Sequence, residues 1–192
     1  MRVITFDIET KAVSLVRGRL DVNELELTVV GIHDSETDTY SSYLKEELPQ
    51  LWPIIEHTDL LIGYNSDSFD IPLLNRYYPG DLTQIRSLDL MSEVQKTLGR
   101  RLRLDSIARA TLGRGKSGDG LKAGTWWEEG RIDKVREYCL DDVRLTRELY
   151  DYALKHSGLK YKDLNQIRDI KLDTSLWNIA TPPATLTHTL PL

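Results

Sequence analysis

The sequence has little cysteine and no long apolar run. Its 192 residues include one cysteine, Cys139, which cannot form an internal disulfide, so nothing ties the protein to an oxidising compartment. No apolar run reaches the roughly 18 residues that a membrane span requires. Asp7 interrupts the apolar start that a signal peptide would need. We therefore expect a protein of a reducing compartment, the cytoplasm, with no membrane contact.

The chain also lacks a basic excess, since 25 Lys and Arg stand against 30 Asp and Glu for a net charge of −5. This balance argues against a generic nucleic-acid coat protein. Positive charge is concentrated in residues 96–122, which hold eight basic and two acidic side chains. Such a segment is either a solvated helix face or a phosphate-contacting surface next to an acidic site.

Hydrophobic periodicity predicts an α/β domain. Its length is typical of one domain. Strands first, then strand and helix in alternation, favour a mixed sheet. The predicted strands are 2–8, 27–32, 37–43 and 60–63, and the predicted helices are 45–56, 70–78, 89–98, 104–112 and 131–156.

Two further segments are predicted to be irregular. The glycine-rich stretch 113–120 is typical of a flexible loop, and it lacks the glycine spacing and the preceding strand of a phosphate-binding loop. Residues 174–192 contain no charged side chain, which is typical of an extended or disordered arm or of a docking strap.

Asp7 and Glu9 are the first unusual acids. A strand has a period of two, so both carboxylates leave the same face of the strand 2–8, about 7 Å apart at their Cα atoms. Like charges on one face repel unless something positive lies between them. The alternative is that the strand ends at Asp7 and both acids are solvated.

The helix 131–156 carries the second unusual acid. Asp142 lies in the middle of its inward stripe, and a buried carboxylate is costly unless it is paired or bound to a metal. Asp141 is expected to face solvent, and Tyr138, four residues before Asp142, projects over the same surface. The alternative is an ion pair of Asp142 with Arg131 or Arg136. The predicted stripe is Val135, Cys139, Asp142, Thr146, Leu149 and Ala153.

The third segment, 63–74, leaves a buried strand through a polar loop and enters an apolar helix. Taken alone, Asp70 is typical of a helix N-cap, with Pro72 in the first turn. Asp67 is the competing acid of the loop.

The order of these segments is more specific than any one of them. Residues 6–10 (Phe-Asp-Ile-Glu-Thr), 63–70 (Gly-Tyr-Asn-x-x-x-Phe-Asp) and 138–142 (Tyr-x-x-x-Asp) resemble the DEDD superfamily of 3′–5′ exonucleases. Glu137 stands where the histidine subclass has His, so the resemblance is to the tyrosine subclass. The sequence is especially similar to the proofreading domains of family-B DNA polymerases and their stand-alone relatives, and 112–116 (Leu-Gly-x-Gly-Lys) also looks like that lineage. The resemblance spans residues 3 to about 152.

The resemblance implies a ribonuclease H-like fold over residues 1–156, with a mixed five-stranded sheet and helices on both faces, followed by a C-terminal extension, 157–192, that is partly extended or disordered. It also implies two divalent metal ions, Mg²⁺ or Mn²⁺. An all-oxygen ligand set suits these hard cations, and the absence of a Cys/His cluster argues against zinc. Two metals about 3.5–4 Å apart can stabilise the attacking and the leaving oxygen of an in-line displacement.

Carried over motif by motif, Asp7 would bridge both metals, and Glu9 and Asp142 would hold the metal that activates water. Asp70 would serve the second metal. Tyr138, with an ordinary pKa of about 10, would orient the attacking water as a neutral hydroxyl. These five residues are the predicted catalytic set, and the four acids are the predicted metal ligands.

The substrate contacts are predicted from the same motifs. Asn65 would reach the terminal nucleotide by hydrogen bonding and Phe69 by packing; the alternatives are a turn residue and a core anchor. Trp126 and Trp127 either stack on bases or seal a core. The predicted substrate-binding residues are Thr10, Asn65, Phe69, Arg101, Arg103 and Lys116.

The predicted function is a metal-dependent 3′–5′ exonuclease that releases nucleoside 5′-monophosphates from single-stranded DNA, with DNA repair as its setting. The chain ends about where a nuclease domain would, so we expect it to be free-standing. One alternative is a 3′–5′ exoribonuclease, since nothing in the sequence distinguishes a 2′-hydroxyl. Another is a catalytically inactive nuclease-like module that binds nucleic acid. A glycosidase built on a carboxylate pair gives no reason for Tyr138 beside Asp142.

Overall fold

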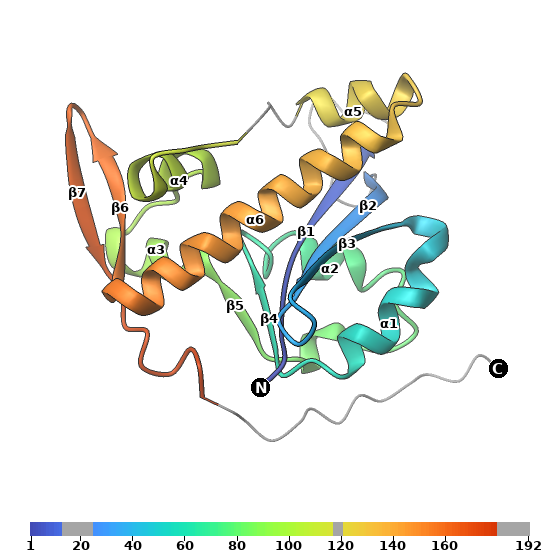
Figure 1. Ribbon diagram of the computed structural model, residues 1–192, viewed down its shortest axis with the longest axis horizontal. Coiled ribbons are helices and arrows are strands. Elements are labelled where there is room, and N and C mark those ends of the chain that lie inside the picture. The colour runs from blue at the N-terminus through green and yellow to red at the C-terminus, as the bar shows by residue number, and fades with distance from the viewer. Residues whose placement is uncertain (13–24, 117–120, 180–192) are drawn as a thin grey trace.

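The computed structural model describes residues 1–12, 25–116 and 121–179. Its centre is a mixed five-stranded sheet in the order β3-β2-β1-β4-β5 (Figure 1). β1 pairs antiparallel with β2 and parallel with β4, and β4 pairs parallel with β5. The expected mixed sheet is therefore present. Its strands are β1 (Val3–Ala12), β2 (Leu25–Asp34), β3 (Thr39–Leu44), β4 (Leu60–Gly63) and β5 (Ser87–Asp89).

Helices cover both faces of the sheet. The long α6 lies across one face, over β1 and β2, while α1 and α2 pack on the other (Figure 1). Residues of β1 alternate between these layers: Val3 joins the apolar cluster that contains residues of α6, and Ile4, Phe6 and Ile8 join the opposite one. The helices are α1 (Leu48–Glu56), α2 (Asp70–Leu74), α3 (Leu90–Leu98), α4 (Leu104–Leu112), α5 (Leu121–Glu128) and α6 (Ile132–His156), with short 3₁₀ turns at Lys45–Glu47 and Leu82–Gln84.

The predicted inward stripe of α6 is confirmed, because all six of its residues are buried. Asp142 is among them, held between apolar neighbours that pack on the sheet. In the described part of the chain, no helix combines the length and the apolar character that crossing a bilayer demands.

Several predicted elements differ from the observed ones. The helix predicted over 70–78 ends at Leu74, because the amides of Arg76 and Tyr77 bond to carbonyls three residues back and form turns. Pro79 then disfavours a helical backbone at Tyr78. The helix predicted over 45–56 begins as a 3₁₀ turn and becomes α-helical at Leu48. β5 and α5 were not predicted.

The C-terminal extension is more ordered than its composition indicates. Within 157–192, β6 (Gly158–Asp163) and β7 (Gln166–Lys171) form an antiparallel hairpin. Trp177 is buried and stacks on Tyr150 of α6. The parts of the predicted irregular segments at 117–120 and 180–192 lie outside the described residues.

Candidate active site

The site forms where three parallel strands end. β1, β4 and β5 run in the same direction, so their carboxyl ends meet at one edge of the sheet, which is where α/β folds place their ligands. β1 pairs with β4 only over Val3–Thr5. Asp7 and Glu9 therefore extend beyond the end of that pairing, beneath α6, with the loop that follows β4 beside them.

Three of the predicted metal ligands lie together. One carboxylate oxygen from each of Asp7, Glu9 and Asp142 lies within 4.8 Å of the others. Asp7 and Glu9 are half-buried, and Asp142 is 2% exposed. The alternative in which the two strand acids are solvated separately is wrong, because β1 continues to Ala12 and both acids face α6. Asp141, by contrast, lies 3.9 Å from Arg114 at the flank of the helix.

Asp70 stands next to this cluster. It is the first residue of α2, 5% exposed, and its carboxylate accepts hydrogen bonds from the backbone of Ile8 and from its own amide. It is not the N-cap, since Phe69 occupies that position. Its charge nevertheless raises the pKa of both Asp7 and Glu9. The competing loop acid, Asp67, is exposed and accepts a hydrogen bond from Ser87.

The clustered acids hold their protons more tightly than isolated ones. Burial, followed by the charge of Asp142, raises the pKa of Glu9 from 4.5 to about 8. Burial also raises the pKa of Asp70 from 3.8 to about 7. The pKa of Asp7 lies well above its ordinary value through burial and the charges of Asp142, Asp70 and Glu9. A site of this kind is stabilised by added positive charge.

Lys116 is the cation that the structure places in this cluster. Its ammonium donates to Asp142 Oδ2 and to the hydroxyl of Tyr138, 3.5 Å away. Burial lowers the pKa of Lys116, but the charges of Asp142 and Asp7, together with the hydrogen bond to Asp142, raise it by more than burial lowers it, so the pKa lies above its ordinary value. Its backbone amide donates to Asp105 Oδ1 at 2.8 Å, which anchors the end of this loop to α4.

Asp142 therefore has a different partner from the two arginines considered in its own helix. Arg131 pairs with Glu129 and Arg136 pairs with Glu47, so neither reaches Asp142. The ion pair comes instead from Lys116, which was predicted as a substrate-binding residue. One lysine among three carboxyl groups leaves the cluster with more acidic than basic side chains.

Tyr138 lies one turn before Asp142 and is 3% exposed. Burial, and then the charge of Asp142, raises its pKa above the ordinary value, so the hydroxyl is neutral and can both donate and accept. The Trp126 ring meets the Tyr138 ring edge-on at 6.1 Å. Trp126 and Trp127 both pack against the cluster around Cys139, which favours the core-sealing interpretation of this pair.

The donor set fits a hard divalent cation. Asp142 Oδ1 is buried and has no hydrogen-bond partner among the described residues, although a buried carboxylate oxygen is normally paired. It belongs to a group of carboxylates that repel one another. Carboxylate oxygens alone, with no Cys or His among them, are the ligands that Mg²⁺ and Mn²⁺ prefer.

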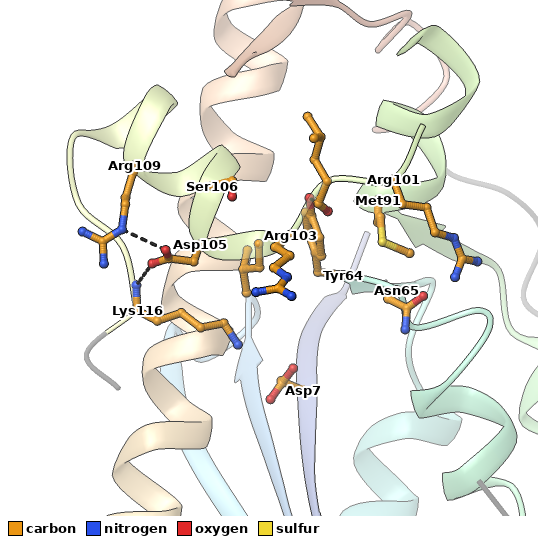
Figure 2. A pocket seen from close by; sticks show the side chains of 12 residues that line it. Asp7, Tyr64, Asn65, Met91, Arg101, Arg103, Asp105, Ser106, Arg109 and Lys116 are labelled. Atoms are coloured by element: carbon orange, nitrogen blue, oxygen red, sulfur yellow. Dashed lines mark hydrogen bonds and ion pairs between the residues drawn. The ribbon is translucent and has the colours of Figure 1, made fainter. Parts of the chain in front are cut away.

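A cavity of about 790 Å³ opens directly above Asp7 (Figure 2). Arg103 and Lys116 point into it, and the Arg103 side chain has no hydrogen bond or ion pair within the part of the chain that the structure describes. Arg101 lines the far side and contacts Gln95. The cavity thus brings an acidic floor and a basic wall together, which is the charge distribution that a phosphodiester with bound cations requires.

The other predicted substrate residues are placed as follows. Asn65 lines the cavity with a left-handed backbone (φ 70°), and its side-chain oxygen is buried without a partner in the described ranges. Phe69 packs against the core beneath α1 and α2, which favours the core-anchor alternative. Thr10 is half-buried on β1, after the irregularity that follows Glu9, and does not line the cavity.

Asp89 is a site residue that was not predicted as one. It ends β5, is 2% exposed, and caps α3 through the amides of Met91 and Ser92. The same carboxylate accepts the backbone amides of Asn65 at 2.8 Å and of Asp67 at 3.3 Å. It therefore fixes the loop that carries Asn65 in its left-handed conformation. The sequence prediction placed Asp89 inside the helix 89–98, whereas the observed helix begins at Leu90 and Asp89 is its N-cap.

Asp89→Ala is expected to lower the free energy of unfolding by about 2–4 kcal/mol, because it removes a cap and leaves buried amides unpaired. The matched control is Asp81→Ala, which removes the exposed cap of the Leu82–Gln84 turn and should cost about 1 kcal/mol. Urea unfolding measures both values. Hydrogen exchange at residues 65–67 should accelerate only in Asp89→Ala, and equal exchange in the two variants would contradict the loop-clamp role.

Comparisons with known proteins bear on the fold and the family. A family model described as the RNase_H superfamily matches residues 4–154. DNA polymerase 1 of Aeropyrum pernix is 31% identical over 175 residues, covering 75% of this chain and 17% of the polymerase. The family B DNA polymerase of the hyperthermophilic archaeon Pyrobaculum calidifontis superposes with a TM-score of 0.63 at 21% identity, over 80% of this chain and 24% of that one. The expected ribonuclease H-like fold and the expected similarity to a DNA polymerase are confirmed, and the chain spans a small part of either polymerase.

Proposed function

The chain belongs to the RNase_H superfamily, and we propose from this that it is a metal-dependent 3′–5′ exonuclease acting on single-stranded DNA. The observation that carries the proposal is the convergence of Asp7, Glu9 and Asp142, from two distant segments, with Asp70 beside them. DNA is preferred over RNA because both relatives described above are named as DNA polymerases.

Asp7, Glu9 and Asp142 would hold one divalent cation, and Asp7 with Asp70 would serve a second. When bound, the two cations would supply Lewis-acid stabilisation of the attacking and leaving oxygens of the phosphodiester. Because the acids repel one another and have raised pKa values, cation binding is expected to be coupled to the loss of protons.

The protein's own groups would position the reactants. The neutral hydroxyl of Tyr138 would accept a hydrogen bond from the attacking water and so aim it at the phosphorus. The unpaired guanidinium of Arg103, which lines the cavity, would bind a phosphate oxygen. The unpartnered side-chain oxygen of Asn65 would accept a hydrogen bond from a hydroxyl of the terminal nucleotide.

Tyr138→Phe is expected to lower kcat by about 10- to 100-fold with little change in KM, because it removes an orienting hydroxyl and keeps the ring that packs on Trp126. Tyr150→Phe is the control, a buried tyrosine of the same helix that stacks on Trp177, away from the site. Steady-state kinetics on a single-stranded oligonucleotide measure both. A Tyr138→Phe enzyme with unchanged kcat, or with only a raised KM, would remove the tyrosine from the mechanism.

The function itself is tested with a 5′-labelled single-stranded DNA in the presence of Mg²⁺ or Mn²⁺. Stepwise shortening from the 3′ end, with nucleoside 5′-monophosphates as products, is expected. An RNA of the same sequence decides the exoribonuclease alternative. Binding of the DNA without any cleavage would favour the inactive module, and internal cuts or shortening from the 5′ end would refute the proposed polarity.

A further inference from the structure

The β6–β7 hairpin lies beyond the family match, which ends at residue 154. It is attached firmly to the nuclease-like fold, because Leu159 and Ile170 are buried in the main core. Thr111 of α4 exchanges two hydrogen bonds with the backbone of Lys160, of 3.1 and 2.9 Å. The hairpin therefore stands as a fixed wall beside α4 (Figure 1).

A second cavity, of about 280 Å³, lies between α4 and this wall. It shares Leu102, Asp105, Ser106 and Arg109 with the large cavity above Asp7. Figure 2 shows Asp105, Ser106 and Arg109 at the end of the large cavity that faces α4. The two cavities thus adjoin across these α4 side chains, and we refer to the pair as one groove, with Asp7 at one end and the hairpin at the other.

The hairpin end of the groove combines basic and apolar groups. Lys162 and Ile167, which are cross-strand partners, line it together with Ala110, and Ile167 is 55% exposed. Arg109 donates from its Nε to Asp105, so the two terminal nitrogens of its guanidinium take no part in that bond. Tyr161 lies in the wall, with the Arg100 guanidinium 5.5 Å from its ring centroid.

This pairing of groups matches a single strand of nucleic acid. Cationic side chains meet phosphates, and exposed apolar surface meets unstacked bases, without a need for sequence readout. The hairpin end of the groove shares four lining residues with the cavity above Asp7, so a strand whose 3′ end lay at Asp7 would have room to extend along α4 toward the hairpin.

We propose that the groove between α4 and the β6–β7 hairpin binds the nucleotides that lie 5′ to the one being removed. The proposal rests on the exonuclease function proposed above and deepens it, since it assigns to a segment outside the family match the task of holding the substrate strand. Longer single strands then gain affinity and turnover efficiency from contacts that a trinucleotide cannot reach.

The test compares two double variants of equal charge change. Lys162→Glu with Ile167→Asp alters the groove, and Lys171→Glu with Leu164→Asp alters the same hairpin at exposed positions that do not line it. Fluorescence anisotropy with single-stranded DNA dodecanucleotide is expected to show affinity about tenfold weaker for the groove variant and within about twofold of wild type for the control. The salt dependence of log K should be shallower for the groove variant, by about 0.7 for one lost phosphate contact.

Kinetics separate this proposal from the one on which it rests. For the wild type and the control variant, kcat/KM on the dodecanucleotide should exceed that on a trinucleotide. In the groove variant, the ratio of these two kcat/KM values should be about tenfold smaller than in the wild type. Equal losses of affinity and of kcat/KM in both double variants, or no loss in either, would refute the proposal that the groove binds the substrate strand. Tighter binding of a dodecamer RNA than of the DNA would assign the groove to RNA. If the wild type cleaves neither length, the exonuclease proposal fails, whatever the binding shows.

Discussion

Asp7→Asn is expected to reduce exonuclease turnover at least about a thousandfold, a loss of about 4 kcal/mol of transition-state stabilisation. Burial, and then the charges of Asp142, Asp70 and Glu9, raise the pKa of Asp7 well above its ordinary value. Asparagine keeps the shape of the side chain and removes the negative charge that would hold the cations. The measurement is kcat/KM on single-stranded DNA at saturating Mg²⁺.

The same variant should be more stable than the wild type in the absence of metal. The folded, metal-free protein disfavours an ionised acid at position 7. Replacing that acid with a neutral amide is therefore expected to raise the free energy of unfolding at neutral pH by about 1 kcal/mol, or the Tm by about 2–4 °C. The matched control is Asp141→Asn, the neighbouring acid that faces Arg114, which should keep turnover. An Asp7→Asn enzyme that retains turnover, or that loses it only by unfolding, would contradict the assignment.

Metal-free protein is expected to lose stability as the pH rises from about 4.5 to 8. The pKa of Glu9 rises from 4.5 to about 8 on folding, and that of Asp70 from 3.8 to about 7. A raised pKa means that the folded state favours the protonated acid, so this contribution is complete below the unfolded pKa and is lost as the pH passes the folded one. Carboxylates with a lowered pKa, such as Asp34 beside Arg2, act below this window.

Divalent cations should reverse that loss, because they bind the ionised carboxylates. At a hundred times its Kd, Mn²⁺ is expected to add about 2.7 kcal/mol, which corresponds to about 5–11 °C in Tm for a chain of this size. The gain should be larger at about pH 8 than at about pH 5, since protons compete with the metal. Thermal unfolding in EDTA and in Mn²⁺ measures both effects. A Tm in EDTA that rises across the window, or a Mn²⁺ shift that is the same at both pH values, would contradict this account.

The carboxylates could be located from the sequence because local geometry determines their directions. The period of two places Asp7 and Glu9 on one face, and the helical period places Asp142 in a buried stripe, whatever the rest of the chain does. The partner of Asp142 could not be predicted in this way. Lys116 comes from a different segment, and its position depends on the pairing of its amide with Asp105.

The hairpin was missed for a related reason. α6 ends at His156, its C-cap Ser157 adopts a left-handed backbone (φ 52°), and Gly158 follows. A Cβ at Gly158 would lie 2.3 Å from the carbonyl oxygen of Ile170, so the glycine is required by a strand that arrives later in the chain. The need for glycine at position 158 could therefore not be predicted without knowing where β7 lies. In the same way, the bond from the Asn65 amide to Asp89 depends on β4 and β5 lying side by side, so Asp89 could not be identified as a site residue from the predicted helix 89–98.

The most direct test of the central claim is the anomalous scattering of crystals soaked in Mn²⁺. The account predicts manganese bound by the carboxylates of Asp7, Glu9 and Asp142, with a second ion served by Asp7 and Asp70. Crystals in which manganese is absent from this cluster at saturating concentration, or binds at Asp67 or Asp141 instead, would contradict it.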